Sequence, residues 1–316
     1  MVNGNLRKYL TDIQASLIRH EYHTSEYTVF KRNEHGKERE IYKLPYFPDR
    51  VVHWAILQVI EPYIIKTLTA DTFSAIPGRG IHYGVKRIKH DMRNDREGTM
   101  YCLKLDMKKY YPSINHEILK QKYARLFKDK ELLWLLDEII DSTDGDTGIP
   151  IGNYLSQYSG NLYLSSFDHW IKEQKQIKYY YRYMDDIVIL HNNKAFLHNL
   201  IGEIREYCDT ELKLTVKDNW QIFPTYVRGV DFLGYRFFGK YTLLRKSTCK
   251  RMKYKMSRVY NKVSNGEQMN YSEWCSISSY GGWLKHCDSY RLNEKYVKPL
   301  EPYARIYYIN NIKNKR

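Results

Sequence analysis

The 316 residues have a globular composition, 43% hydrophobic and 28% charged, with 51 Lys and Arg against 36 Asp and Glu. The resulting net charge of +15 favours a polyanionic partner, nucleic acid above all, and five cysteines without a Cys-x-x-Cys pair argue against a zinc module or a disulfide framework. The chain has neither a signal-like start nor an apolar run of membrane length, which predicts a cytoplasmic protein that engages no membrane.

A helix and a two-stranded hairpin are predicted at the start of the chain. Residues 6–22 have helical periodicity, and residues 27–45 read as a hairpin that turns at His35 and Gly36. Taken alone, the charges on this hairpin indicate only a solvated surface. Its cations include Lys31, Lys37 and Arg39.

Further helices are predicted in three places. Asp49 is a suitable N-cap for an amphipathic helix that ends before Pro62, and residues 116–141 have helical apolar spacing. The segment 148–157, with two glycines and a proline, leads into a helix predicted over residues 158–172.

Three carboxylates follow strand-like runs. Residues 179–190 predict a β-hairpin with Asp185 and Asp186 at its turn, and the strand over 100–105 leads directly into Asp106. A lone Asp-Asp turn is usually structural, but these strands are too apolar for an exposed hairpin. Three acidic groups at adjacent strand ends repel one another unless cations neutralise them, which predicts two Mg²⁺ ions and phosphoryl transfer.

The chain becomes strongly basic after residue 240. Helical spacing combined with many cations indicates either a solvated helix or a surface that binds a nucleic acid backbone. The cations at the start of this stretch include Lys246, Lys250, Arg251 and Lys253.

These segments, in this order, resemble the blocks of reverse transcriptases. Tyr183-Met184-Asp185-Asp186 is similar to the signature of that family, and Asp106 resembles the aspartate of its first palm motif. The resemblance spans nearly the whole chain. It implies an α/β (α+β) right-hand polymerase fold with an antiparallel palm sheet and a helical thumb. The implied domains are fingers over 1–100 with interleaved palm segments, palm over 101–240 with 145–175 partly on the fingers side, and thumb over 241–316.

The resemblance assigns catalytic roles. Asp106 and Asp185 would hold two Mg²⁺ ions, with Asp186 supporting them and the carbonyl of Met107 as a further ligand. Lys217 matches the lysine that approaches the departing pyrophosphate as a general acid; a surface lysine on a strand is the alternative.

The resemblance also assigns substrate contacts. Arg39 matches the arginine against the incoming dNTP, and Lys31 or Lys37 supplies a neighbouring cation for its phosphates. Tyr110, as the first ring of its pair, is the predicted steric gate against ribonucleotides, with Tyr111 as the alternative and a plain core role open for either. The residues assigned to template and primer are Arg79, Gly234, Lys246, Lys250, Arg251 and Lys253.

The segment 148–157 departs from most reverse transcriptases. Ile151 replaces a glutamine before Gly152, and Gln157 follows Ser156 where a proline is usual. This pattern resembles the reverse transcriptases of diversity-generating retroelements, which implies misincorporation at template adenine. An isoleucine in place of the glutamine removes an amide next to the incoming nucleotide, which should relax the selection of the correct base. The implied partners are a template RNA, an RNA/DNA duplex and a small accessory protein in a ribonucleoprotein complex.

Two other functions stay open. The first is a related bacterial reverse transcriptase of phage defence or of a retron, which the Ile151 and Gln157 pattern disfavours. The second is an RNA-binding scaffold that keeps the fold without polymerising, which the intact aspartates disfavour because clustered carboxylates without cations destabilise a fold.

Overall fold

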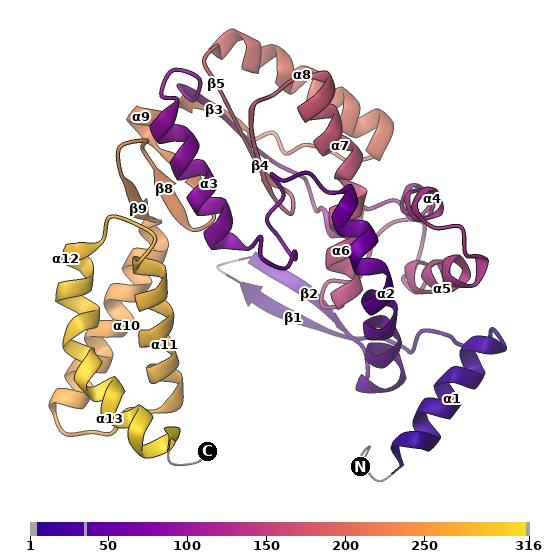
Figure 1. The fold of residues 1–316 in the computed structure, drawn as a ribbon, viewed down its shortest axis with the longest axis horizontal. Coiled ribbons are helices and arrows are strands. Elements are labelled where there is room, and N and C mark those ends of the chain that lie inside the picture. The colour runs from indigo at the N-terminus through magenta and orange to yellow at the C-terminus, as the bar shows by residue number, and fades with distance from the viewer. Residues whose placement is uncertain (1–4, 35–36, 314–316) are drawn as a thin grey trace. The chain divides into compact units, whose positions relative to one another are not determined.

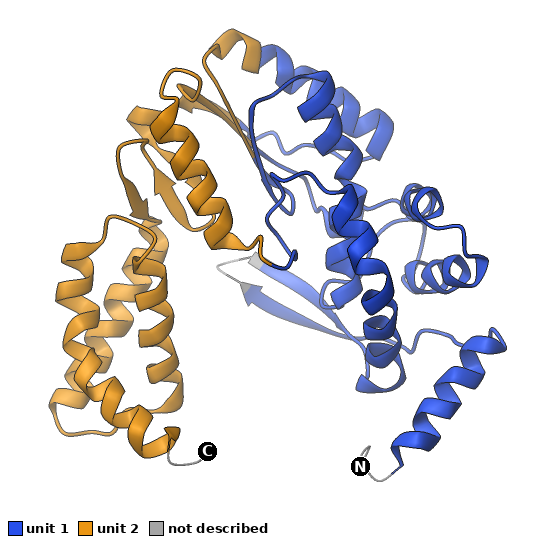
Figure 2. Cartoon of the chain, viewed as in Figure 1, with its two compact units in different colours: residues 1–77, 105–187, 198–220 blue, residues 78–104, 188–197, 221–316 orange. Residues whose placement is uncertain are grey.

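The computed structural model describes residues 5–34 and 37–313, without the side chains of residues 34 and 37 (Figure 1). The chain divides into two compact units (Figure 2). The first comprises residues 1–77, 105–187 and 198–220, and the second comprises residues 78–104, 188–197 and 221–316. The division into fingers, palm and thumb at residues 100 and 240 stays a prediction.

The first unit begins with the predicted helix and hairpin. Helix α1 covers Leu6–Ile18, and strands β1 (Thr28–Glu34) and β2 (Lys37–Lys43) pair antiparallel with Thr28 opposite Lys43. The predicted turn at His35 and Gly36 lies outside the described residues, as does the Lys37 side chain.

Helix α2 (Val51–Thr67) differs from the prediction at both ends. It continues through Pro62, because buried apolar residues such as Ile56 and Ile64 lie on both sides of the proline and outweigh the one backbone hydrogen bond lost there. Asp49 does not cap it but lies in the preceding π-helical turn η1 (Tyr46–Arg50), where its carboxylate accepts hydrogen bonds from Tyr22 Oη and Ser25 N.

The central sheet has four strands in the order β4-β5-β3-β6. They are β3 (Tyr101–Asp106), β4 (Tyr179–Tyr183), β5 (Asp186–His191) and β6 (Gln221–Pro224). Strands β3 and β6 pair antiparallel with Cys102 opposite Phe223. The predicted strand before Asp106 and the predicted hairpin around Asp185 are both confirmed, and the boundaries of the two units fall inside β3 and β5.

Helices surround the strands of the first unit. They are α4 (His116–Leu126), α5 (Lys130–Ile140), α6 (Tyr154–Tyr163), α7 (Ser165–His169), the short turns η2 (Tyr111–Ser113) and η3 (Trp170–Gln174), and α8 (Lys194–Leu212), whose first turn belongs to the second unit. The side chains of Asn115 and Asp129 cap α4 and α5, which confirms the two helices predicted over 116–141. The helix predicted over 158–172 instead begins at Tyr154 and is broken at Leu164.

The second unit is mainly helical. Besides β6 and parts of β3 and β5, its strands are β7 (Val230–Phe232), β8 (Tyr235–Phe237) and β9 (Thr242–Leu244). Its helices and turns are α3 (Ile81–Asn94), α9 (Thr225–Arg228), α10 (Lys246–Ser264), α11 (Tyr271–Leu284), α12 (Tyr290–Leu292), η4 (Asn293–Val297), η5 (Lys298–Leu300) and α13 (Glu301–Asn311). Asn270 and Glu273 form a capping box that starts α11. Methionines and valines bury one face of α10, and cations such as Lys246, Lys250 and Arg251 are exposed. Within the described ranges, no helix has both the length and the apolarity that a bilayer crossing requires.

Candidate active site

The turn between β4 and β5 presents two carboxylates at the surface of the first unit. The flanking strands are almost entirely buried, so the turn has a rigid base. Met184 reverses the chain with a φ of +53°, a left-handed conformation that is uncommon for a residue other than glycine. Asp185 completes the turn and Asp186 begins β5; both are half-buried.

Asp106 ends β3 beside this turn. Strand β3 lies next to β5 in the sheet, and burial together with the neighbouring Asp106 carboxyl raises the pKa of Asp185 to about 7. In the part of the chain that the structure describes, no three His, Cys, Asp or Glu side chains form a ready metal cluster. The carboxylates that neighbouring strands bring to this turn are those of Asp106 and Asp185, and Asp186 follows directly in the sequence. Oxygen ligands that repel one another fit a divalent cation, which would relieve the repulsion.

Lys217 contacts Asp106 through both backbone and side chain. The segment around Val216 pairs antiparallel with Met107, and Lys217 N donates to Asp106 O at 2.9 Å. Lys217 Nζ forms an ion pair with the Asp106 carboxylate. The lysine is therefore placed beside the carboxylate pair, and the Met107 backbone is held in the same short ladder.

The two tyrosines after Asp106 have different surroundings. Tyr110 is only 3% exposed, and its hydroxyl donates to Gly160 O at 2.5 Å. The Tyr111 hydroxyl points to Met184 Sδ at 3.5 Å, and its pKa is raised by burial and by the Asp185 charge. Tyr110 was the predicted steric gate, but its burial suits a core role. Tyr111 is the ring that borders the carboxylate turn.

The segment 148–157 contacts the β1–β2 hairpin. Tyr42 N donates to Ile151 O at 2.9 Å. Gly152 has a φ of +124°, and a Cβ there would lie 2.8 Å from Tyr42 O, so only glycine fits without a shift. Arg39 lies on β2, the strand whose Tyr42 forms the hydrogen bond with Ile151. The structure thus joins Ile151 and Gly152 to the strand that bears Arg39.

Other predicted site residues lie on the surface of the first unit. Gln157 is exposed on α6, and Lys31 is exposed on β1, where its Nζ is 3.4 Å from Glu38 Oε2. Among the described residues, no hydrogen bond or ion pair joins Gln157 or Lys31 to Asp106 or Asp185.

The residues predicted to bind template and primer belong to the second unit. Gly234, at a φ of +83°, turns β7 into β8, and its carbonyl accepts from Arg245 N at 2.9 Å. A Cβ on Gly234 would collide with the Trp283 ring, so this glycine has a packing role of its own. The cations on α10 are exposed at Lys246, Lys250 and Arg251, and Lys253 lies 5.7 Å from the centre of the Tyr296 ring. Arg79 is half-buried before α3.

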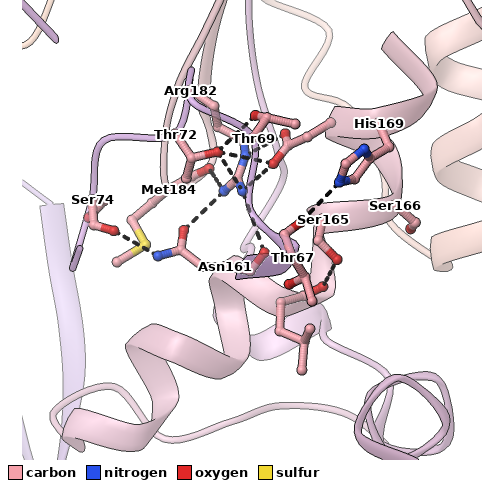
Figure 3. A network of polar contacts seen from close by, with 12 residues as sticks. Thr67, Thr69, Thr72, Ser74, Asn161, Ser165, Ser166, His169, Arg182 and Met184 are labelled. Atoms are coloured by element: carbon pink, nitrogen blue, oxygen red, sulfur yellow. Dashed lines mark hydrogen bonds and ion pairs between the residues drawn. The ribbon is translucent and has the colours of Figure 1, made fainter. Parts of the chain in front are cut away.

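The structure also contains a buried charged residue, Arg182, that the sequence analysis did not identify. Arg182 lies in the centre of β4 with no exposed surface and ion-pairs with Asp168 (Figure 3). The sequence does contain an indication of this pair: an arginine within a run of tyrosines that forms a buried strand needs a buried partner for its charge.

An antiparallel sheet with helices around it and carboxylates at a strand turn and a neighbouring strand end is the fold of a polymerase palm. The family described as reverse transcriptase (RNA-dependent DNA polymerase) matches residues 29–237. The chain therefore belongs to the reverse transcriptase family, whose enzymes are RNA-directed DNA polymerases.

Several known proteins are similar to the chain. Protein YkfC of Escherichia coli K12 is 22% identical over 318 residues, which cover 86% of this chain and 81% of that protein. Nuclear intron maturase 1, mitochondrial, of Arabidopsis thaliana is 25% identical over 111 residues, 34% of this chain and 15% of that protein.

Among solved structures, apo telomerase from Candida tropicalis matches 92% of this chain and 59% of its own, with a TM-score of 0.58 and 13% identity. Telomerase from Candida albicans in complex with a TWJ fragment of telomeric RNA matches 91% of this chain and 59% of its own, with a TM-score of 0.55 and 11% identity. The chain thus spans less than two thirds of either telomerase chain, and the likeness is one of fold.

Proposed function

We propose that Asp106, Asp185 and Asp186 form the metal-binding centre of this RNA-directed DNA polymerase, with two Mg²⁺ ions as the cofactor. The observation that carries the proposal is the sheet order, which puts Asp106 at the end of β3 next to β5 and so beside the β4–β5 turn that bears Asp185. The Met107 carbonyl is a further candidate ligand. Bound there, the two ions would supply activation of the primer 3′-OH and charge stabilisation of the dNTP triphosphate.

The neighbouring side chains would act on the substrate. Lys217 Nζ forms an ion pair with the Asp106 carboxylate, a position that suits a general acid for the departing pyrophosphate. Arg39 would contact the dNTP from β2, with Lys31 or Lys37 as a second phosphate cation. Tyr111 would exclude the ribose 2′-OH, because its hydroxyl reaches Met184 in the turn, whereas the Tyr110 hydroxyl is bound to Gly160 in the core.

Replacing one carboxylate tests the metal centre. Asp185→Asn keeps the size of the side chain but removes its charge. Incorporation of dNTPs on a primed RNA template should fall by at least about 10³-fold, because metal ligation supplies several kcal/mol of transition-state stabilisation. RNA binding should persist, and the exposed Asp144→Asn variant should polymerise normally. Unchanged incorporation by Asp185→Asn would remove the proposed site.

We further propose that the chain copies a template RNA into adenine-altered cDNA, as diversity-generating retroelements do, within a complex that includes a small accessory protein. The support is the Ile151–Gly152 and Ser156–Gln157 pattern, together with the Tyr42–Ile151 hydrogen bond that joins this segment to the hairpin bearing Arg39. The telomerase neighbour bound to an RNA fragment is consistent with an RNA partner.

Sequencing of cDNA tests the error-prone activity. Ile151→Gln restores an amide near the nucleotide and should lower errors at template adenine by about tenfold, the discrimination that one added hydrogen bond supplies. Ile151→Leu keeps an alkyl group and should leave the error spectrum as in the wild type. An equal frequency of errors at template adenine in the wild type, Ile151→Gln and Ile151→Leu would show that residue 151 does not control these errors. That result would favour a retron or phage-defence enzyme. RNA binding without any incorporation would favour the scaffold.

A further inference from the structure

A buried ion pair lies next to the β4–β5 turn. Arg182 and Asp168 are both 0% exposed, and Arg182 Nε and Nη2 donate to the two carboxylate oxygens of Asp168 at 2.7 and 2.6 Å. The Tyr180 hydroxyl donates to the same carboxylate at 2.5 Å. Because burying two charges costs several kcal/mol, apolar side chains of similar volume are often at least as stable as such a pair. A contribution to folding stability alone therefore does not explain why the chain has this buried ion pair.

The remaining donors of Arg182 reach the turn itself. Arg182 Nη1 donates to Met184 O at 3.0 Å and to Asn161 Oδ1 at 3.2 Å (Figure 3). Met184 has the left-handed φ of +53°, which costs a non-glycine residue about 1–2 kcal/mol and needs external support. The guanidinium thus connects a fixed carboxylate to the carbonyl that immediately precedes Asp185.

The surrounding backbone holds Arg182 on both sides. Arg182 N donates to Asp71 O at 2.9 Å, and Phe73 N donates to Arg182 O at 3.0 Å, so this segment extends the sheet next to β4. Asn161 Nδ2 donates to Ser74 O at 2.7 Å, which ties α6 to the same segment (Figure 3). The guanidinium therefore has little freedom to move, and the Met184 carbonyl is held by a rigid donor.

We propose that Arg182, anchored by Asp168, is a positioning residue for the catalytic turn. It fixes the Met184 carbonyl and through it the direction in which the Asp185 carboxylate leaves the turn. The inference rests on the proposed role of Asp185. Arginine suits this role because its planar fork serves a carboxylate and a carbonyl at once, whereas a lysine offers a single point charge.

Two variants of the full chain separate positioning from stability. Arg182→Met combined with Asp168→Leu removes both charges and should keep the chain folded, as judged by thermal unfolding. Arg182→Lys keeps the charge but loses the fork. In both, kcat for dNTP incorporation should fall about 10²-fold with little change in KM for dNTP, because a small misplacement of a catalytic group costs that much. Affinity for Mn²⁺ alone, measured by electron paramagnetic resonance, should fall about tenfold or more.

A matched control removes a buried hydrogen bond elsewhere in the first unit. Tyr123→Phe deletes the 2.8 Å contact between Tyr123 Oη and Ser159 Oγ, and both kcat and Mn²⁺ affinity should stay at the wild-type level. The proposal is overturned if a folded Arg182→Lys variant keeps wild-type kcat and Mn²⁺ affinity. If the double variant does not fold, Arg182→Lys decides alone. If the wild type incorporates no dNTP, the proposed function fails, and the Mn²⁺ affinities still decide the positioning role.

Discussion

At the scale of single residues, the neighbours Tyr110 and Tyr111 differ in what they contact. The Tyr110 hydroxyl is bound to Gly160 inside the core, while Tyr111 borders Met184 in the turn. A steric gate has to stand where the sugar of the incoming nucleotide lies, next to the metal ligands. Tyr111, whose hydroxyl lies 3.5 Å from Met184 Sδ, is therefore the proposed gate.

Replacing each tyrosine tests this assignment. Tyr111→Ala should raise incorporation of ribonucleotides relative to deoxyribonucleotides by about 10–200-fold, because it removes the clash that rejects the 2′-OH. Tyr110→Phe should keep the sugar preference and lose only about 1 kcal/mol of stability with the hydrogen bond to Gly160. Single-nucleotide incorporation with matched rNTP and dNTP measures the ratio. A shifted ratio in Tyr110→Phe with none in Tyr111→Ala would reverse the two roles.

The strand ends that carry the aspartates follow from the sequence more directly than the different surroundings of the two tyrosines. Asp106 and Asp185 follow apolar strands, and the periodicity of strands shows where such runs end. Lys109, however, has a φ of +46°, and a short helical turn follows from Tyr111. This local reversal decides which of two adjacent rings enters the core, and no periodic pattern encodes it.

At the scale of elements, the contact between the 148–157 segment and β2 depends on one glycine. Gly152→Ala places a Cβ 2.8 Å from Tyr42 O at a φ of +124°, so stability should fall by about 1–3 kcal/mol. KM for dNTP should rise about fivefold to tenfold, because the Tyr42–Ile151 hydrogen bond that holds the Arg39 strand weakens. Denaturant unfolding and steady-state kinetics measure the two effects.

A second glycine supplies the control. Gly202 lies inside α8, and a Cβ there meets no atom within 4 Å. Gly202→Ala should stabilise the chain by up to about 1 kcal/mol through helix propensity and leave KM unchanged. If Gly152→Ala behaved like Gly202→Ala, the close approach of β2 would have no energetic consequence.

Two features of the helices and strands could not be predicted from the sequence, because both depend on tertiary contacts. Helix α2 passes Pro62 because its buried face continues beyond the proline, a tertiary effect that outweighs local propensity. The Arg182 network joins β4, α6, α7 and the segment around Thr72, which are far apart in the sequence. The lone cation in β4 signals a buried partner, but only the folded chain identifies that partner as Asp168.

At the scale of the whole molecule, the net charge of +15 predicts the kind of partner but not the surface that binds it. In the second unit, α10 buries its methionines and valines, and its cations Lys246, Lys250 and Arg251 are exposed to solvent. Because phosphate contacts release condensed counterions, we expect this helix to contribute a salt-dependent share of the affinity for an RNA/DNA duplex.

Duplex affinity measured by fluorescence anisotropy across about 50–200 mM salt tests this expectation. Each of Lys246→Gln, Lys250→Gln and Arg251→Gln should reduce the slope of log affinity against log salt by about 1, and the triple variant by about 3. The kcat at saturating duplex should not change, because these side chains act on binding. Lys298→Gln is the control, since that ammonium lies 2.9 Å from both carboxylate oxygens of Glu294. A triple variant with the wild-type slope would show that α10 does not contact the duplex and that the basic excess binds it elsewhere.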